Sequence, residues 1–97
     1  MAEYVRVVTF DADDEALDAL LSDINSASGP PEEIPAKRIT VLADRSAGKV
    51  VVAVRFGSAE DLQKGHAAFE AMSPPAGVNL RRVAVDSYEV VLDRQAP

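Results

Sequence analysis

The chain has 97 residues, a formal net charge of −6 and an apolar fraction of 47%. This length accommodates a single domain spanning residues 1–97, and the composition is that of a folded globular protein rather than a disordered or fibrous one. Because the charge balance is acidic and the basic residues are dispersed, we expect no nucleic-acid partner.

Cysteine is absent from the sequence, which excludes disulfides, thiolate metal ligands and thiol catalysis and suits a reducing cytoplasm. The first residues lack the basic and apolar regions of a signal peptide. The longest apolar run, Val50–Val54, is far shorter than a membrane span. We therefore expect a cytoplasmic protein with no membrane partner.

The first predicted element is a strand over about residues 3–10, with apolar side chains on both faces. The acidic segment Asp11–Glu15 follows, and its carboxylates suit a helix N-terminus. A metal site is the alternative there, but the segment lacks the spacing of a calcium loop. The first helix then carries an apolar stripe at helical spacing, made of Leu17, Leu20, Leu21 and Ile24. We expect it to end at Gly29, Pro30 and Pro31.

The middle of the chain predicts a β-hairpin. A second strand over about residues 36–43 precedes the turn-like segment Asp44–Lys49, in which Gly48 would adopt a positive φ. A third strand, residues 50–56, follows the turn and stops at Gly57.

A second helix is predicted from Ser58 onward, because Ser58 and Asp61 form a capping-box pattern. The buried face of this helix is expected to consist of Leu62, Gly65, Phe69 and Met72. The segment Ser73–Gly77 stops the helix, and a fourth strand runs from about residue 80 to 92 before a frayed tail.

The predicted order is therefore strand, helix, strand, strand, helix, strand. Two βαβ-like halves joined through a hairpin describe an α+β, ferredoxin-like βαββαβ fold. Right-handed crossovers place both helices on one face of a four-stranded antiparallel sheet with the spatial order 4-1-3-2.

Apolar residues on both faces of this sheet indicate a homodimer. In the third strand, Val50, Val52 and Val54 lie on one face, whereas Val51 and Ala53 lie on the other. Helices cover only one face, and an exposed apolar face of several strands exceeds the patch size usual for monomers. We therefore expect two copies to pack through these sheet faces. A monomer with scattered exposed valines is the alternative.

Three segments carry a family resemblance: the strand and turn Val41–Lys49, the strand end and helix start Phe56–Leu62, and the closing strand Val85–Val91. Together with the element order, they resemble the dimeric α+β barrel superfamily, in particular small proteins similar to the antibiotic-biosynthesis monooxygenase domain. The resemblance spans almost the whole chain. Its motifs are turns, caps and strands, so they indicate a fold more than an activity.

This resemblance implies two sheets packed into a barrel across the dimer, with a pocket in each subunit between sheet and helices. Members of the superfamily include cofactor-independent oxygenases, haem-degrading enzymes and proteins with no assigned activity. The haem-degrading branch pairs an Asn on the first strand with a Trp at the end of the third and a His on the second helix. Here the first strand has no Asn, Phe56 stands at the Trp position and only His66 matches. Neither haem degradation nor a cofactor is therefore predicted.

His66 is the sole histidine, and histidine is the side-chain type that changes charge near neutral pH. It follows Leu62 by four residues and precedes Phe69 by three, which puts it at the edge of the apolar stripe, where a pocket would open. The alternatives for His66 are a boundary residue, a ligand contact or acid–base group, and an axial metal ligand. Gly65 beside it indicates either a close helix–sheet approach or room over a cavity.

Arg6, Arg55 and Tyr88 are polar-tipped residues on strands predicted to be central or nearly so. An arginine on a half-buried sheet face needs a carboxylate partner, which Asp86 or Glu89 would supply. The alternative is that Arg6 and Tyr88 orient a polar ligand in an otherwise apolar pocket.

We therefore predict a homodimer that binds a small, largely apolar molecule, without a metal or cofactor. The first alternative is a cofactor-independent monooxygenase acting on an aromatic or quinol-type substrate, with His66, Arg6 and Tyr88 as catalytic residues. The second is a structural or interaction module whose own side chains fill the pocket.

Overall fold

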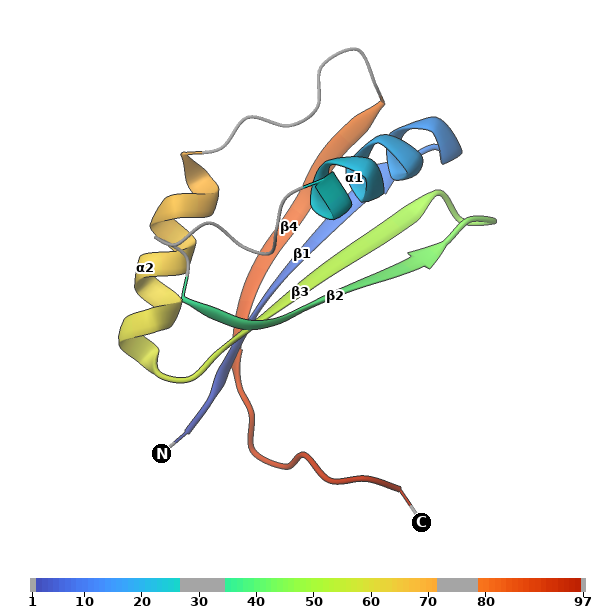
Figure 1. The fold of residues 1–97 in the computed structure, drawn as a ribbon. Coiled ribbons are helices and arrows are strands. Elements are labelled where there is room, and N and C mark those ends of the chain that lie inside the picture. Colours follow the sequence, from blue (N-terminus) through green and yellow to red (C-terminus); the bar gives the residue numbers. More distant parts are fainter. Residues whose placement is uncertain (1, 27–34, 72–78, 97) are drawn as a thin grey trace.

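The elements follow the predicted order in the computed structural model, which describes residues 2–26, 35–71 and 79–96. They are β1 (Tyr4–Ala12), α1 (Asp14–Ser26), β2 (Ala36–Asp44), β3 (Lys49–Phe56), α2 (Ala59–Glu70) and β4 (Leu80–Glu89) (Figure 1). The α+β, ferredoxin-like βαββαβ class is thus confirmed. Strand β4 ends three residues earlier than the sequence pattern indicated. The segments that we expected to terminate the helices, Gly29–Pro31 and Ser73–Gly77, lie outside the described residues, as does Met72.

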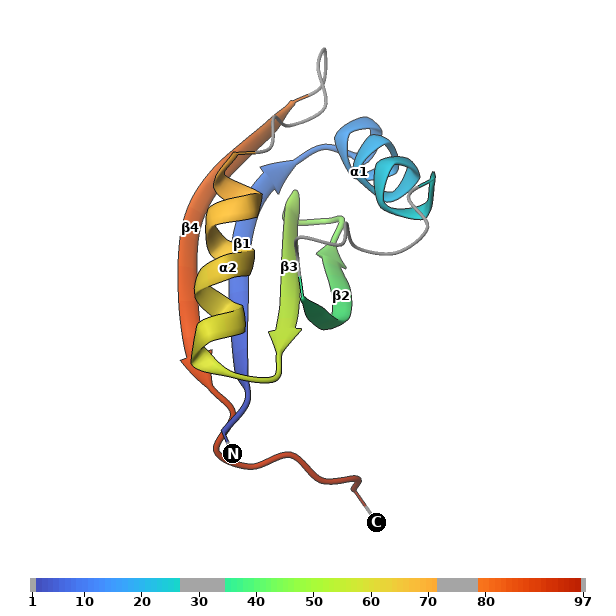
Figure 2. The ribbon, with the colours of Figure 1, turned by 60° about the vertical axis from the view of Figure 1, so that its left-hand side comes forward.

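The four strands form one antiparallel sheet with the order β2-β3-β1-β4, which is the predicted order viewed from the other edge. Strands β1 and β3 are central, and β2 and β4 are the edges. In both views of the ribbon the two helices lie apart from each other, α2 over one end of the sheet and α1 over the other (Figures 1 and 2).

Both helix starts are capped as the sequence indicated. The Asp13 carboxylate accepts a hydrogen bond from the backbone N–H of Ala16 at 2.8 Å. The Ser58 hydroxyl accepts one from the backbone N–H of Asp61 at 3.1 Å. Each cap satisfies a donor that would otherwise have no partner in the first helical turn. The acidic segment before α1 is therefore a helix cap.

The β2–β3 turn uses the expected glycine. Gly48 has a φ of +66°, a left-handed conformation that glycine adopts without steric cost. The Asp44 carboxylate accepts hydrogen bonds from the Ser46 hydroxyl and from the backbone N–H of Ala47, which closes the turn. This fixes the register of the hairpin.

The core consists of two clusters, one under each helix. The α1 cluster has the buried residues Ala12, Ala16, Leu17 and Val50, and the α2 cluster has Val54, Phe56 and Leu62. Of the partly buried residues, Val52 packs against both clusters. Because Val50, Val52, Val54 and Phe56 alternate along β3, they lie on one face, so both helices cover the same side of the sheet.

Gly65 lets α2 approach the sheet closely. A Cβ atom at this position would lie 2.2 Å from Cε1 and 2.3 Å from Cζ of the Phe56 ring, far inside van der Waals contact. Phe56 is fully buried, so its ring occupies the space that a side chain at residue 65 would need. Of the two alternatives for Gly65, the structure therefore shows the close helix–sheet approach and not room over a cavity.

The opposite face of the sheet carries the other set of alternating residues. Val5 and Val7 of β1 and Val51 of β3 are half-buried there, although none of the described helices covers this face. At the two edges Leu42 is 57% exposed and Tyr88 is 56% exposed. We call this surface the open face; the valines in its middle agree with the sequence pattern of β3.

Candidate functional site

Among the residues that the structure describes, Arg6 is the charged residue that is buried, with 4% of its surface exposed. It lies on the central strand β1 and is paired with Val54 of β3, so it points to the helix side within an apolar layer. A buried charge is costly unless it is paired and hydrogen-bonded. The surroundings of Arg6 therefore define the candidate site.

Helix α2 supplies three partners for the Arg6 guanidinium. Nη2 donates to Oε1 of Glu70 at 2.9 Å, and Nε donates to Nδ1 of His66 at 3.2 Å. Cζ of Arg6 lies 5.1 Å from the centroid of the Phe69 ring, a cation–π distance. His66 and Glu70 are one helical turn apart on the same face of α2, which is why both reach one guanidinium.

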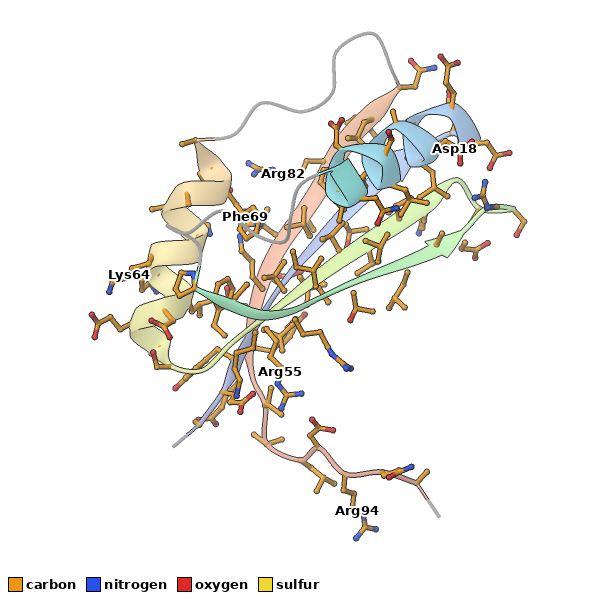
Figure 3. All side chains as sticks on the ribbon, viewed as in Figure 1. Asp18, Arg55, Lys64, Phe69, Arg82 and Arg94 are labelled. Atoms are coloured by element: carbon orange, nitrogen blue, oxygen red, sulfur yellow. The ribbon has the colours of Figure 1, made fainter. Side chains whose placement is uncertain are left out.

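A second arginine reaches the same carboxylate from β4. Nη1 of Arg82 donates to Oε1 of Glu70 at 2.6 Å, so a single oxygen accepts from two arginines. Figure 3 shows Arg82 and Phe69 on the helix side of the sheet. We call Arg6, His66, Glu70 and Arg82 the arginine cluster.

The charges within the arginine cluster influence one another. The hydrogen bond from Arg82, followed by the attraction of both arginines, lowers the pKa of Glu70 below its ordinary value. Burial lowers the pKa of Arg6, and the attraction of Glu70 opposes this. Glu70 is also the last residue of α2, where the helix dipole disfavours a negative charge. The two arginines, rather than the helix, hold this carboxylate in place.

A register shift in β4 turns Arg82 toward the helices. Thr9 pairs with Ala84, but the next residue, Phe10, pairs with Arg82, which leaves Val83 as an extra residue in the strand. Such a bulge changes which face the following side chains occupy. Arg82 therefore points toward Glu70, and Val83, which regular alternation would have placed with Val85, is 54% exposed.

The structure brings two of the three predicted site residues together. His66 is half-buried at the edge of α2, and its Nδ1 accepts from Arg6, which places the proton of the neutral ring on Nε2. Tyr88 pairs with Val5 and lies on the open face, on the opposite side of the sheet from Arg6. Arg6 and Tyr88 therefore do not line one pocket.

The expected carboxylate partner of Arg6 is present but is a different residue. Glu70 takes the position that the sequence suggested for Asp86 or Glu89. One signal for Glu70 was available, because it follows His66 by four residues and so shares its helix face. Arg55 lies on the open face, where it pairs with Glu3 at 2.6 Å and with Asp93 (Figure 3).

A broad depression of about 720 Å³ lies away from the arginine cluster, at the end of the sheet near the start of α1. Its polar side chains pair with each other, since Arg81 donates to Asp11 at 2.6 Å and Asn79 donates to Asp13 at 2.9 Å. Over residues 2–26, 35–71 and 79–96, no group of three or more metal-ligating side chains could hold an ion. Over the same residues, no helix is long and apolar enough to cross a membrane.

Comparison with protein-family models, with curated proteins and with solved structures gave no match to this chain. We therefore infer the function from the arginine cluster and the open face.

Proposed function

We propose that the protein is a homodimeric α+β barrel that binds a small, largely apolar molecule on the helix side of its sheet, beside the arginine cluster. The observation that carries this proposal is the burial of Arg6 in the apolar layer under α2. Replacing a buried ion pair by apolar residues of similar size often leaves stability unchanged or raises it. A role in ligand recognition would explain why Arg6 is charged, because ligand sites combine apolar walls with a few polar groups.

The arrangement of the core supports the same location. The α1 cluster and the α2 cluster meet through Val52, so the centre of the helix side lies between two helices that pack separately. Phe69 and Val52, both partly buried, provide apolar surface near this centre. A flat aromatic molecule beside Phe69 would meet the arginine cluster at one edge.

The open face supports the dimer. Val5, Val7 and Val51 form its middle, and Leu42 and Tyr88 add exposed apolar surface at its edges. Two such faces packed together would remove this surface from water, with a twofold axis between the sheets. Face-to-face packing is also what the resemblance to antibiotic-biosynthesis monooxygenase-like proteins implies.

Binding, rather than oxygenation, is the function that we propose. A proton relay through His66, Arg6 and Tyr88 would need the three side chains on one side of the sheet, and Tyr88 lies on the other. Nδ1 of His66 is also engaged by Arg6, which leaves that nitrogen unable to take a proton from a substrate while the contact persists.

Nuclear magnetic resonance of the isotopically labelled chain tests the binding proposal. We expect naphthyl compounds, namely 1-naphthoate, 1-naphthamide and 1-naphthylmethanol, to perturb the amide signals of His66 and Phe69 while leaving Thr40 on the open face unchanged. Absence of any perturbation at His66 and Phe69 by all three compounds would overturn the proposal. Light scattering tests the dimer, for which we expect twice the 10.3 kDa mass of one chain.

A further inference from the structure

The arginine cluster carries a surplus positive charge. It contains two guanidinium groups and one carboxylate, and both guanidinium groups donate to the same oxygen of Glu70. The chain as a whole has a net charge of −6, so this local surplus stands out from the rest of the molecule. Arginine presents a planar set of donors that suits carboxylates in particular.

Glu70 can leave this position more easily than Arg6 can. The Glu70 side chain is 36% exposed, whereas that of Arg6 is 5% exposed. Rotation of Glu70 into water would also move its charge away from the negative end of the α2 dipole. Arg6 would then be a buried cation without a counter-ion, a state that an incoming anion would relieve.

Arg82 offers an anion a path to Arg6. Its side chain is 48% exposed, and the extra residue Val83 turns it toward the helix side. Bulges of this kind often re-aim a side chain at a functional site. Two apolar side chains on the helix side of the sheet are only partly buried, namely Val85 of β4 and Phe69 of α2, the residue before Glu70. The site therefore combines an arginine pair with an adjoining hydrocarbon surface.

We infer that the ligand is a small organic acid whose carboxylate replaces the side chain of Glu70 between Arg6 and Arg82. Glu70 then acts as an internal competitor that occupies the anion position in the free protein. This inference rests on the proposed binding function and adds the chemical class of the ligand. An isosteric amide lacks the charge that would offset Arg6, so it would not displace Glu70.

The decisive comparison is the affinity of 1-naphthoate and 1-naphthamide for the full chain and for Glu70→Gln, measured by titration calorimetry. We expect Glu70→Gln to bind 1-naphthoate about tenfold tighter than the unchanged protein, because the competing charge is gone. Binding of 1-naphthamide should stay the same. Glu60→Gln is the matched control, since it removes one carboxylate from the same helix at a position where Glu60 pairs with the exposed Lys64. Its affinities should equal those of the unchanged protein.

A second variant keeps the test independent of Glu70. Arg82→Gln should weaken binding of 1-naphthoate about tenfold and leave that of 1-naphthamide unchanged, since it removes one guanidinium at the surface. Circular dichroism should show the same helix content in all variants. If either substitution changed the affinities for 1-naphthoate and 1-naphthamide by the same factor, the inference about an organic acid would be overturned, whereas the binding proposal would stand. Failure of all naphthyl compounds to perturb His66 and Phe69 would instead overturn the binding proposal.

Discussion

Replacing Gly65 by alanine is expected to destabilise the protein, although alanine is the better helix former. Within α2 the substitution by itself would stabilise the helix by about 1 kcal/mol. The new Cβ atom, however, would lie 2.2 Å from the Phe56 ring, where carbon atoms normally approach to about 3.5–4.0 Å. Phe56 is fully buried and cannot turn outward, so α2 must move away from the sheet.

Overpacking of this kind costs about 1–3 kcal/mol, and sometimes more. Subtracting the helix-propensity gain from the upper part of that range leaves a net loss of about 1–2 kcal/mol. For a domain of this size, each kcal/mol lowers the melting temperature by about 4–8 °C. Thermal and urea denaturation followed by circular dichroism would measure both quantities.

Two further variants separate the contact with Phe56 from the intrinsic effect of alanine. Phe56→Leu removes the ring atoms that would meet the new Cβ, so Gly65→Ala should cost less in that background. Ala67→Gly, at an exposed position of the same helix, should lose about 1 kcal/mol from helix propensity alone. The close approach of α2 would be refuted if Gly65→Ala stabilised the protein, and did so by the same amount in the unchanged protein and in the Phe56→Leu variant.

Substitutions at the α2 cap, the β2–β3 turn, the arginine cluster and the open face should each have a distinct effect. Ser58→Ala should lower the unfolding free energy by about 1 kcal/mol in urea denaturation, through loss of the α2 cap; an unchanged midpoint would contradict it. Gly48→Ala should cost about 1–2 kcal/mol because of the positive φ, and Gly48→Asn should cost less by the same measurement; equal losses would count against this cause. The arginines hold the pKa of Glu70 below its ordinary value of 4.5, so this carboxylate contributes stability that is present above pH 4.5 and is lost as the pH falls below it. Urea midpoints from pH 7 to pH 3 should therefore fall less steeply in Glu70→Gln, and parallel curves would rule out that contribution. Val51→Asp should place a charge in the middle of the open face and reduce the mass measured by light scattering to the 10.3 kDa of one chain; a dimer that survives would show that the copies meet elsewhere.

Local sequence patterns were sufficient for most of the fold. The spacing of Leu17 and Leu62 with their neighbours, the caps at Asp13 and Ser58 and the turn at Gly48 each depend on residues close together in the chain. Such signals are readable without knowing what packs against them.

The site required information that the sequence does not carry locally. Arg6 and Glu70 are 64 positions apart, and their contact depends on how α2 is placed over β1. The alternation of residues along β4 indicated which of them share a face with Tyr88. It did not indicate whether those residues lie on the same face of the sheet as Arg6 of β1. The extra residue at Val83 interrupts that alternation, so the orientation of Arg82 could not be inferred from strand periodicity.

The division of the core into two clusters affects how the protein unfolds locally. Helix α1 and helix α2 each pack on their own set of strand residues, and Val52 is the partly buried residue against which both clusters pack. Contacts of this kind favour cooperative units that unfold one at a time rather than together. Amide hydrogen exchange should therefore separate the two helices into groups with different opening free energies, while the central strands β1 and β3 exchange only on global unfolding. The ligand proposed here would bind beside the seam between those units, and its binding should slow exchange in α2 more than in α1.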